Sequence, residues 1–518
     1  MDIETRIAKA MASGGASIFI TSVTDFVVFM TGVLSSLPVI QDFSIYAGLA
    51  ILFDLVLQAT FFVAILVFDA RRQTANKAEC CFAFYRPKNP KGRHCFGSCN
   101  KSEYKSTDLG PLDYFIGEII PPIILSKVGK VIIILASMVI GGFSIYGATK
   151  LRSDFNYEWF IDTNSPVNDV FEIRDEWFGN RRGNLVSIYT REGDYATQWR
   201  ELDALSDALH KEYWIDASNV DSWFDAYKDW LSSALATDTC SVKTALEGPH
   251  VNERFYSCLR SFLANPESGA RYARNIQWSN DSTISSTRIP AAFERTENDE
   301  EQVEAMEAVR EVATVAKSFS TIAYSFNFIY LEGSKVIRWQ TVRSLIISSA
   351  FVCVVTLALL MNVVGSLIVF LHVALVDAAL LACLWLAGYS FNMITSIVIV
   401  LAVGLSVDYS THIVYAFLEA QGPDRHDRVQ TAMRHIGSTV LNGGITTWLS
   451  IAVLATAKAY VFKIFFISFT IIVVFALLYG LLLIPVLLAI IGPNPMPKLN
   501  ENNDHKQTTE LSSSKISS

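Results

Sequence analysis

Residues 390–417 form an apolar run that is long enough to cross a bilayer, yet it contains Asp408 and His412. About 20 such residues predict a transmembrane helix, and a carboxylate near its centre costs roughly 2.5 to 3.5 kcal/mol on insertion scales. Gly404, Asp408 and His412 recur every fourth residue, so a helix places them on one face.

This face suggests ion coupling. A glycine at position 404 lets a neighbouring helix approach closely, and the carboxylate of Asp408 and the imidazole of His412 can share or pass a proton. We therefore expect a proton-coupled or ion-coupled transporter. The alternative is a buried Asp408 that is satisfied by Ser or Thr hydroxyls and has no transport role.

The composition is that of a polytopic membrane protein. Of the 518 residues, 51% are hydrophobic, which is too apolar for an ordinary soluble domain. The net charge of −8 is spread unevenly between loops and spans and gives no indication of nucleic-acid binding. The sequence contains no nucleotide-binding loop, metal-ligand cluster or nucleophile elbow, so we expect no enzyme activity, no cofactor, and an energy source other than ATP.

Eight segments are apolar and long enough to span a bilayer. The positive-inside rule places the basic segments 71–108 and 419–435 in the cytoplasm. Counting crossings then predicts cytoplasmic N- and C-termini and one large extracytoplasmic domain, in the plasma membrane or an endomembrane. The predicted spans are 14–34, 44–68, 128–149, 341–361, 365–386, 391–417, 437–455 and 462–491.

The chain divides into six predicted parts. Two of them are polar and cytoplasmic, and the last of these lacks apolar residues and should be disordered. The parts are 1–70, a pair of spanning helices; 71–127, a basic linker and an interfacial helix; 128–149, one span; 150–337, the extracytoplasmic domain; 338–492, a five-helix bundle; and 493–518, the tail.

The extracytoplasmic domain is predicted to be ferredoxin-like. Strands at 185–190, near 276, at 283–289 and at 321–331 alternate with helices at 197–212 and 300–317 in the order β-α-β-β-α-β. An insertion at 213–266 contains Trp214, Trp223 and Trp230, which form either a small core or the wall of a lipid entrance.

Several residues in these parts are candidate sites. Cys240 and Cys258 are the only cysteines of the domain, and an oxidising compartment predicts a disulfide between them. Asn280 begins a glycosylation sequon. Acidic Asp25 and Asp54 lie in the first two spans, where pairing with hydroxyls or amides and a functional role are both plausible. The span 365–386 adds two further polar residues, His372 and Asp377.

The chain also contains an internal repeat. Two stretches in the same direction match at a constant offset and share an amphipathic segment, a span, a short turn and a second span, which is typical of parallel-repeat transporters with sites between the halves. The counterpart of Asp408 would precede residue 1, so we expect a truncated form of such a transporter, or a divergent protein that lost that helix. The matching pairs are Arg6/Arg428, Ala10/Ala432, Met11/Met433, Gly15/Gly437, Thr24/Thr446 and Phe43/Phe465.

Three motifs carry a resemblance to a known family. They are GLSVDYSTH at 404–412, YAGLAILFD at 46–54, and SFN at 390–392, which opens the helix of Asp408. The chain resembles the Patched and Niemann-Pick C branch of the resistance-nodulation-division superfamily over nearly its whole length, and is most similar to Patched-related proteins.

The resemblance implies twelve spans and two extracytoplasmic ferredoxin-like domains in a complete protein, with residues 14–68 as the last two helices of a sterol-sensing domain. It also implies movement of sterols or other membrane lipids on a proton or sodium gradient, with Asp408 as the coupling carboxylate and His412 as its partner. The alternative is a non-transporting receptor or regulator that binds a lipid or a protein ligand through the extracytoplasmic domain. A protein ligand and an oligomer are both possible partners.

Overall fold

The computed structural model describes residues 3–74, 111–154, 161–162, 164–173, 176–177, 184–233, 240–247, 250–279, 283–296 and 298–494. Most of the predicted basic linker 71–108, the predicted glycosylation site Asn280 and nearly all of the predicted tail 493–518 lie outside these residues. Those three predictions therefore remain predictions.

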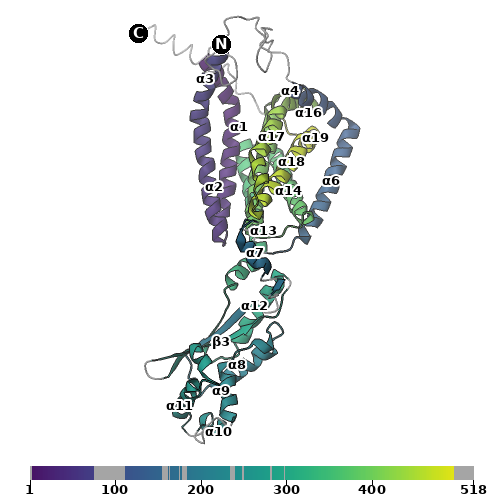
Figure 1. Ribbon diagram of the computed structural model, residues 1–518. Helices are drawn as coiled ribbons and strands as arrows, with labels where there is room; N and C mark the ends of the chain where they lie inside the picture. The colour runs from purple at the N-terminus through teal and green to yellow at the C-terminus, as the bar shows by residue number, and fades with distance from the viewer. Residues whose placement is uncertain are drawn as a thin grey trace, which may run out of the picture.

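A bundle of helices makes up most of the described chain, and a smaller domain extends from one end of it (Figure 1). Eight helices in the described residues are long and apolar enough to cross a membrane, in agreement with the eight predicted spans. Three of these eight are continuous rods that are built from several elements, and five are single helices. They are α1 (Ile3–Gly32); α2, η1 and α3 (Pro38–Leu57, Gln58–Phe62, Val63–Thr74); α6 (Lys127–Lys150); α13 (Phe328–Leu360); α14 (Val363–Leu386); α15 (Met393–Glu419); α16, η8, α17 and η9 (Arg425–Ala432, Met433–Gly437, Ser438–Ala452, Val453–Thr456); and α18, η10 and α19 (Tyr460–Leu478, Tyr479–Leu483, Ile484–Ile491).

Helix α15 is the central helix of the bundle. Of its most apolar window, 83% is buried, whereas none of the corresponding window of α2 and α3 is. Its start is fixed by a capping box: Asn392 Oδ1 accepts from the Thr395 main-chain N at 2.9 Å, and Thr395 Oγ1 accepts from the Asn392 main-chain N at 2.9 Å. Helices α1, α13, α14 and α18 pack around it, which explains the nearly continuous apolar sequence of α15.

The smaller domain has the predicted ferredoxin-like topology. Its sheet has the order β2-β3-β1-β4 with antiparallel neighbours, and the buried side chains of α8 and α12 share one core with the sheet. The elements are β1 (Leu185–Arg191), α8 (Trp199–Lys211), β2 (Ile276–Trp278), β3 (Ile284–Ala292), α12 (Asp299–Ala313) and β4 (Ser320–Tyr324).

The strand predicted at 321–331 is too long. Strand β4 ends at Tyr324, and the helix α13 begins at Phe328. The aromatic sequence favoured a strand, but Phe328 and Leu331 are buried, and their spacing of three residues places both on one helix face. Packing of these side chains therefore outweighs local β propensity here.

The insertion forms a small aromatic core. It consists of α9 (Trp223–Ser232), α10 (Val242–Ala245) and α11 (Val251–Ala264). Trp223 and Trp230 are buried, and the Trp230 ring lies 5.8 Å from that of Phe262. The core interpretation is therefore right for these two residues, while Trp214 is partly buried. As predicted, Cys240 and Cys258 form a disulfide, which ties the start of α10 to α11.

The structure preserves the internal repeat. Helix α2 begins at Pro38 and α18 at Tyr460, which is the offset found in the sequence. The two copies are packed differently, however. Arg428 is buried and donates to the carbonyl oxygens of Ala420, Phe417 and Pro493 at 2.7 to 3.0 Å, whereas its counterpart Arg6 is exposed. The second helices of the two copies thus begin at matching positions but have different surroundings.

A clamp of polar contacts fastens the domain to the first turns of α13. Asp299 Oδ2 accepts from Ser334 Oγ at 2.8 Å, and Glu307 pairs with Lys335 at 3.1 Å. Arg310 also pairs with Glu332. We call these contacts the α12–α13 clamp.

Further along, α13 is hydrogen-bonded to both α15 and α1. Thr341 Oγ1 lies 2.6 Å from Ser396 Oγ of α15, and Ser348 Oγ lies 2.6 Å from Thr31 Oγ1 of α1. Helix α13 thus connects the domain with the two helices that carry the candidate site.

Candidate functional site

Gly404 opens a space on α15 that is filled by a carboxylate from α1. A Cβ atom added at Gly404 would lie 3.2 Å from Asp25 Oδ1 and 3.6 Å from Phe29 Cε2. The close approach of α1 to α15 at this level is one that an added side chain would press on, because Asp25 would have to move by a few tenths of an ångström. Asp25, one of the two acids whose role the sequence left open, belongs to the same site as Gly404.

Asp25 and Asp408 form a pair of partly buried carboxyl groups, each with a buried Oδ1 atom. The two groups interact electrostatically, and Asp25 Oδ1 and Asp408 Oδ1 each lack a hydrogen-bond partner among the described residues. Two carboxylates in a low-dielectric environment repel each other and lose their hydration. The arrangement is suited to holding a shared proton or a small cation between them.

The two serine hydroxyls that flank Asp408 on α15 bond to the helix backbone. Ser406 Oγ donates to the Val403 carbonyl at 3.1 Å, and Ser410 Oγ donates to the Val407 carbonyl at 2.8 Å. These hydroxyls are used by the helix backbone. No hydrogen bond from them to Asp408 Oδ1 is present in the part of the chain that the structure describes.

His412 lies one turn further along the same face of α15. Its Nδ1 atom is 2.6 Å from Ser17 Oγ of α1, so the imidazole is held by the helix that also contributes Asp25. Sequence reasoning missed Ser17. Its signal was the spacing of four residues in Ser17, Thr21 and Asp25, which aligns these polar side chains on one face of a helix.

The other predicted intramembrane residues lie elsewhere. Asp54 is on the exposed side of α2, where it accepts from Gln58 Nε2 at 2.6 Å. His372 Nε2 lies 3.2 Å from the Ala476 carbonyl oxygen. Asp377 is buried, and neither of its carboxyl oxygens has a hydrogen-bond partner among the described residues. Both His372 and Asp377 are on α14, so the structure does not bring them into the contact between α1 and α15.

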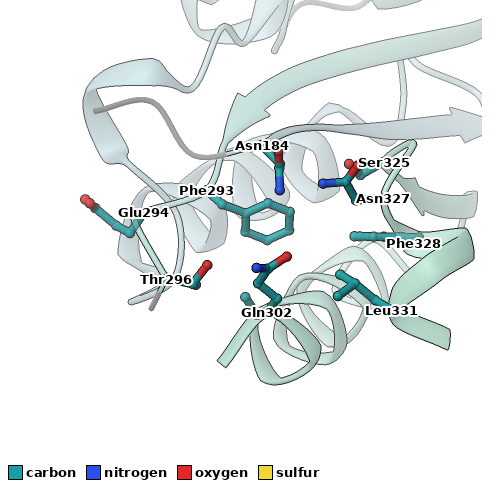
Figure 2. A pocket seen from close by; sticks show the side chains of 10 residues that line it. Asn184, Phe293, Glu294, Thr296, Gln302, Ser325, Asn327, Phe328 and Leu331 are labelled. Atoms are coloured by element: carbon teal, nitrogen blue, oxygen red, sulfur yellow. The ribbon is translucent and has the colours of Figure 1, made fainter. Parts of the chain in front are cut away.

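No group of three His, Cys, Asp or Glu side chains is positioned to hold a metal ion within the described ranges. A cavity does occur where the domain meets α13 (Figure 2). Phe293 and Phe328 supply apolar walls and Gln302 and Asn327 supply amides, but the enclosed space admits little more than one water molecule. It is too small for a sterol or an acyl chain.

Comparison with known proteins finds matches over most of the chain. Residues 162–511 match the family described as the MMPL family, and residues 1–86 match the sterol-sensing domain of SREBP cleavage-activation. The pig NPC intracellular cholesterol transporter 1 is 25% identical over 95% of this chain and 42% of its own length. The mouse NPC1-like intracellular cholesterol transporter 1 is 24% identical over 95% of this chain and 40% of its own length. The chain thus spans about two fifths of the length of these relatives.

A solved structure shows the same fold. The cryo-EM structure of the hedgehog release protein Disp from the water bear Hypsibius dujardini superposes with a TM-score of 0.55 at 16% identity, covering 92% of this chain and 58% of that one. The names of the pig and mouse relatives describe transporters, which supports the expectation of a protein that is not an enzyme. The chain belongs to the MMPL family, within the Patched and Niemann-Pick C branch of the resistance-nodulation-division superfamily.

Proposed function

We propose that this chain moves sterols or other membrane lipids as a transporter of the Patched-related type, driven by a proton or sodium gradient. The cholesterol-transporter relatives support the lipid substrate. The observation that carries the coupling is the pair of Asp25 and Asp408, in which the Oδ1 atom of each residue is buried and has no hydrogen-bond partner among the described residues. The prediction that the chain is a truncated form stays a prediction.

The proposed mechanism uses the repulsion between the two carboxyl groups. When a proton or a sodium ion occupies the space between Asp25 and Asp408, repulsion falls and α1 packs against α15 at Gly404. When the ion leaves, repulsion returns and favours separation of the two helices. Ser17 and His412 keep the helices in register one turn away. Ion binding and release thereby alternate the packing of α1 on α15.

The lipid would reach the protein from the bilayer on the side of the ferredoxin-like domain. We propose, from the basic segments flanking the spans, that this side is extracytoplasmic and that both termini are cytoplasmic. Plasma membrane and endomembranes both satisfy this orientation.

Flux of a labelled sterol in vesicles containing the full chain tests the coupling. We expect Asp25→Asn and Asp408→Asn each to abolish the dependence of flux on the imposed proton or sodium gradient. The double variant should be no worse than either single variant, because the two groups act as one site. Asp54→Asn is the matched control, since Asp54 is an intramembrane acid outside the site, and it should transport normally. Unchanged ion dependence in both single variants would refute the mechanism.

The second candidate function is a receptor or regulator that does not transport. The α12–α13 clamp favours it, because a ligand on the domain would be connected mechanically to α13. It predicts a ligand-dependent change in protection of the domain from hydrogen exchange in the full chain that persists in Asp408→Ala. Loss of that response together with loss of flux in Asp408→Ala would favour the transporter.

A further inference from the structure

Asp377 is a buried acid that the proposed mechanism does not use. It lies in the middle of α14, is 3% exposed, and neither of its carboxyl oxygens has a hydrogen-bond partner among the described residues. Val373, Leu380 and Leu384 lie on the same side of α14 and are fully buried, so hydrocarbon flanks the carboxyl group along its own helix. Native proteins rarely leave a buried polar group in this state, and an ionisable group within a span is a candidate functional site by default.

Two neighbouring helices contact the side of α14 that is opposite Asp377. A Cβ atom added at Gly147 of α6 would lie 2.8 Å from Cβ of Ala382, and His372 Nε2 lies 3.2 Å from the Ala476 carbonyl oxygen of α18. Both Ala382 and His372 are five residues from Asp377, which corresponds to about 140° around a helix. Helices α6 and α18 therefore do not cover Asp377.

Helix α15 contacts a third side of α14. A Cβ atom added at Gly365 would lie 3.0 Å from Val414 Cγ1 of α15, and Gly365 is about 120° around the helix from Asp377. Helix α13 is the remaining neighbour that packs against α14. Asp377 thus lies at the interface of α14 with α13, the helix that the α12–α13 clamp fastens to the ferredoxin-like domain.

An apolar interface of this kind favours the protonated form of a carboxyl group. An ionised carboxylate that is buried without a donor or a counter-charge loses its hydration without a compensating interaction, whereas the protonated group is neutral. Other ionisable side chains occur in the central parts of α14 and of the elements packed against it, but none of them bonds to Asp377 in the part of the chain that the structure describes. They are His372, Cys383, Cys353, Asp408, Tyr409, His412 and Tyr479.

The surroundings of Asp377 fit a proton better than a metal cation. Hard cations take several oxygen ligands. Within the described ranges, Asp377 belongs to no group of three side chains that could hold a metal ion, and the residues that flank it on its side of α14 are aliphatic.

We propose that Asp377 is a second proton-binding site of the bundle, separate from Asp25 and Asp408. The bound proton keeps the carboxyl group neutral, so that α13 packs against α14. Loss of the proton to water places a charge in the interface and favours separation of the two helices. Because the α12–α13 clamp ties α13 to the ferredoxin-like domain, protonation of Asp377 also favours one position of the domain.

Proton release on unfolding tests the site. The purified full chain in detergent micelles is unfolded at neutral pH in weakly buffered solution, and the released protons are titrated. A protonated buried carboxyl group ionises when unfolding exposes it to water, so the wild type should release about one proton more than Asp377→Asn. Asp377→Leu is a second variant and should give the same difference. Equal release from the wild type and both variants would show that Asp377 is ionised in the folded chain and would overturn the proposal.

Asp42→Asn is the matched control. Asp42 is an exposed acid near the start of α2, so water reaches its carboxyl group in the folded and the unfolded chain. Its replacement should leave the number of released protons at the value of the wild type.

Hydrogen exchange of α13 tests the link between the proton and helix packing. At alkaline pH, where Asp377 loses its proton, α13 should be less protected in the wild type than in Asp377→Asn at the same pH. At acidic pH the two proteins should be equally protected. Equal protection at both pH values would show that the proton does not control the contact of α13 with α14, and would overturn that part of the proposal.

Asp408→Asn separates the two sites. In a chain that carries this substitution, adding Asp377→Asn should still lower proton release on unfolding by about one proton, because Asp377 is not part of the carboxyl pair. Ion-coupled flux that depends on Asp25 and Asp408, together with equal proton release from the wild type and Asp377→Asn, would overturn the second site and leave the proposed function intact. The extra proton of Asp377 in a chain whose flux does not depend on Asp25 or Asp408 would retain the second site and refute the coupling.

Discussion

Gly404→Ala should alter ion coupling with little change in stability. The added Cβ would lie 3.2 Å from Asp25 Oδ1, which is the free end of a side chain that can move by a few tenths of an ångström. Rotation of Asp25 by about 30° from its rotamer costs roughly 0.5 to 1.5 kcal/mol. We expect the ion concentration for half-maximal flux to rise about two- to tenfold.

Two further glycines provide controls of the same chemistry. At Gly147 on α6, a Cβ would lie 2.9 Å from the Cα of Ala382 on α14, so the two helices must separate. Overpacking of this kind costs about 1 to 3 kcal/mol, and Gly147→Ala should lower the unfolding temperature without changing ion dependence. At Gly142 nothing lies within 4 Å of the added atom. Gly142→Ala should be neutral or gain up to about 1 kcal/mol from helix propensity.

The three variants are compared in one pair of measurements. Thermal unfolding of the purified chain reports packing, and gradient-driven sterol flux in vesicles reports coupling. The expected pattern is a changed ion dependence in Gly404→Ala only and a lowered unfolding temperature in Gly147→Ala only. Wild-type ion dependence in Gly404→Ala would show that the contact between Gly404 and Asp25 is not part of the ion site.

Three other outcomes follow from contacts elsewhere. Replacing Cys240 and Cys258 by serine removes a disulfide between residues 18 apart and should lower the free energy of unfolding by about 3 kcal/mol. The unfolding temperature should fall, and a reducing agent should lower that of the wild type in the same way. Ser17→Ala leaves His412 Nδ1 without its partner and should cost about 1 to 3 kcal/mol in the same measurement, whereas Ser17→Thr keeps the hydroxyl and should cost less. The hydrogen bond from Lys335, and its charge, lower the pKa of Glu307 below its ordinary 4.5. The contact of Glu307 with Lys335 therefore contributes its full stabilisation above pH 4.5 and loses it as the pH falls through the lowered pKa of Glu307. Stability should fall less steeply on acidification in Glu307→Gln than in the wild type. Equal slopes in the two proteins would contradict this assignment.

Local sequence signals predicted the central helix well. The apolar run 390–417 and the spacing of Gly404 and Asp408 lie within one helix, so their consequences can be worked out without knowing the partner helix. The same holds for the ferredoxin-like order, since each strand and helix carries its own periodicity. The prediction of a strand at 321–331 was wrong at its end, because a helix that begins with aromatic residues has a composition typical of a strand.

The partner of Asp408 was beyond the reach of the sequence. The repeat predicts a counterpart of Asp408 at a fixed offset, before residue 1. In the structure, the carboxyl group that interacts with Asp408 is that of Asp25, and the repeat does not relate these two residues. Which faces of α1 and α15 meet is decided by packing of the whole bundle. Asp54 illustrates the same point, because it looked equivalent to Asp25 in the sequence and lies on the exposed side of α2.

The α12–α13 clamp has a thermodynamic consequence. It joins the domain to a helix that is hydrogen-bonded to α1 through Thr31 and to α15 through Ser396. If Asp25 and Asp408 bind an ion as proposed, a ligand on the domain that prefers the ion-bound arrangement of α1 and α15 must raise the affinity for the ion, and ion binding must raise the affinity for that ligand by the same factor. A titration of the domain at two ion concentrations therefore measures the same coupling free energy as a titration of the ion with and without ligand.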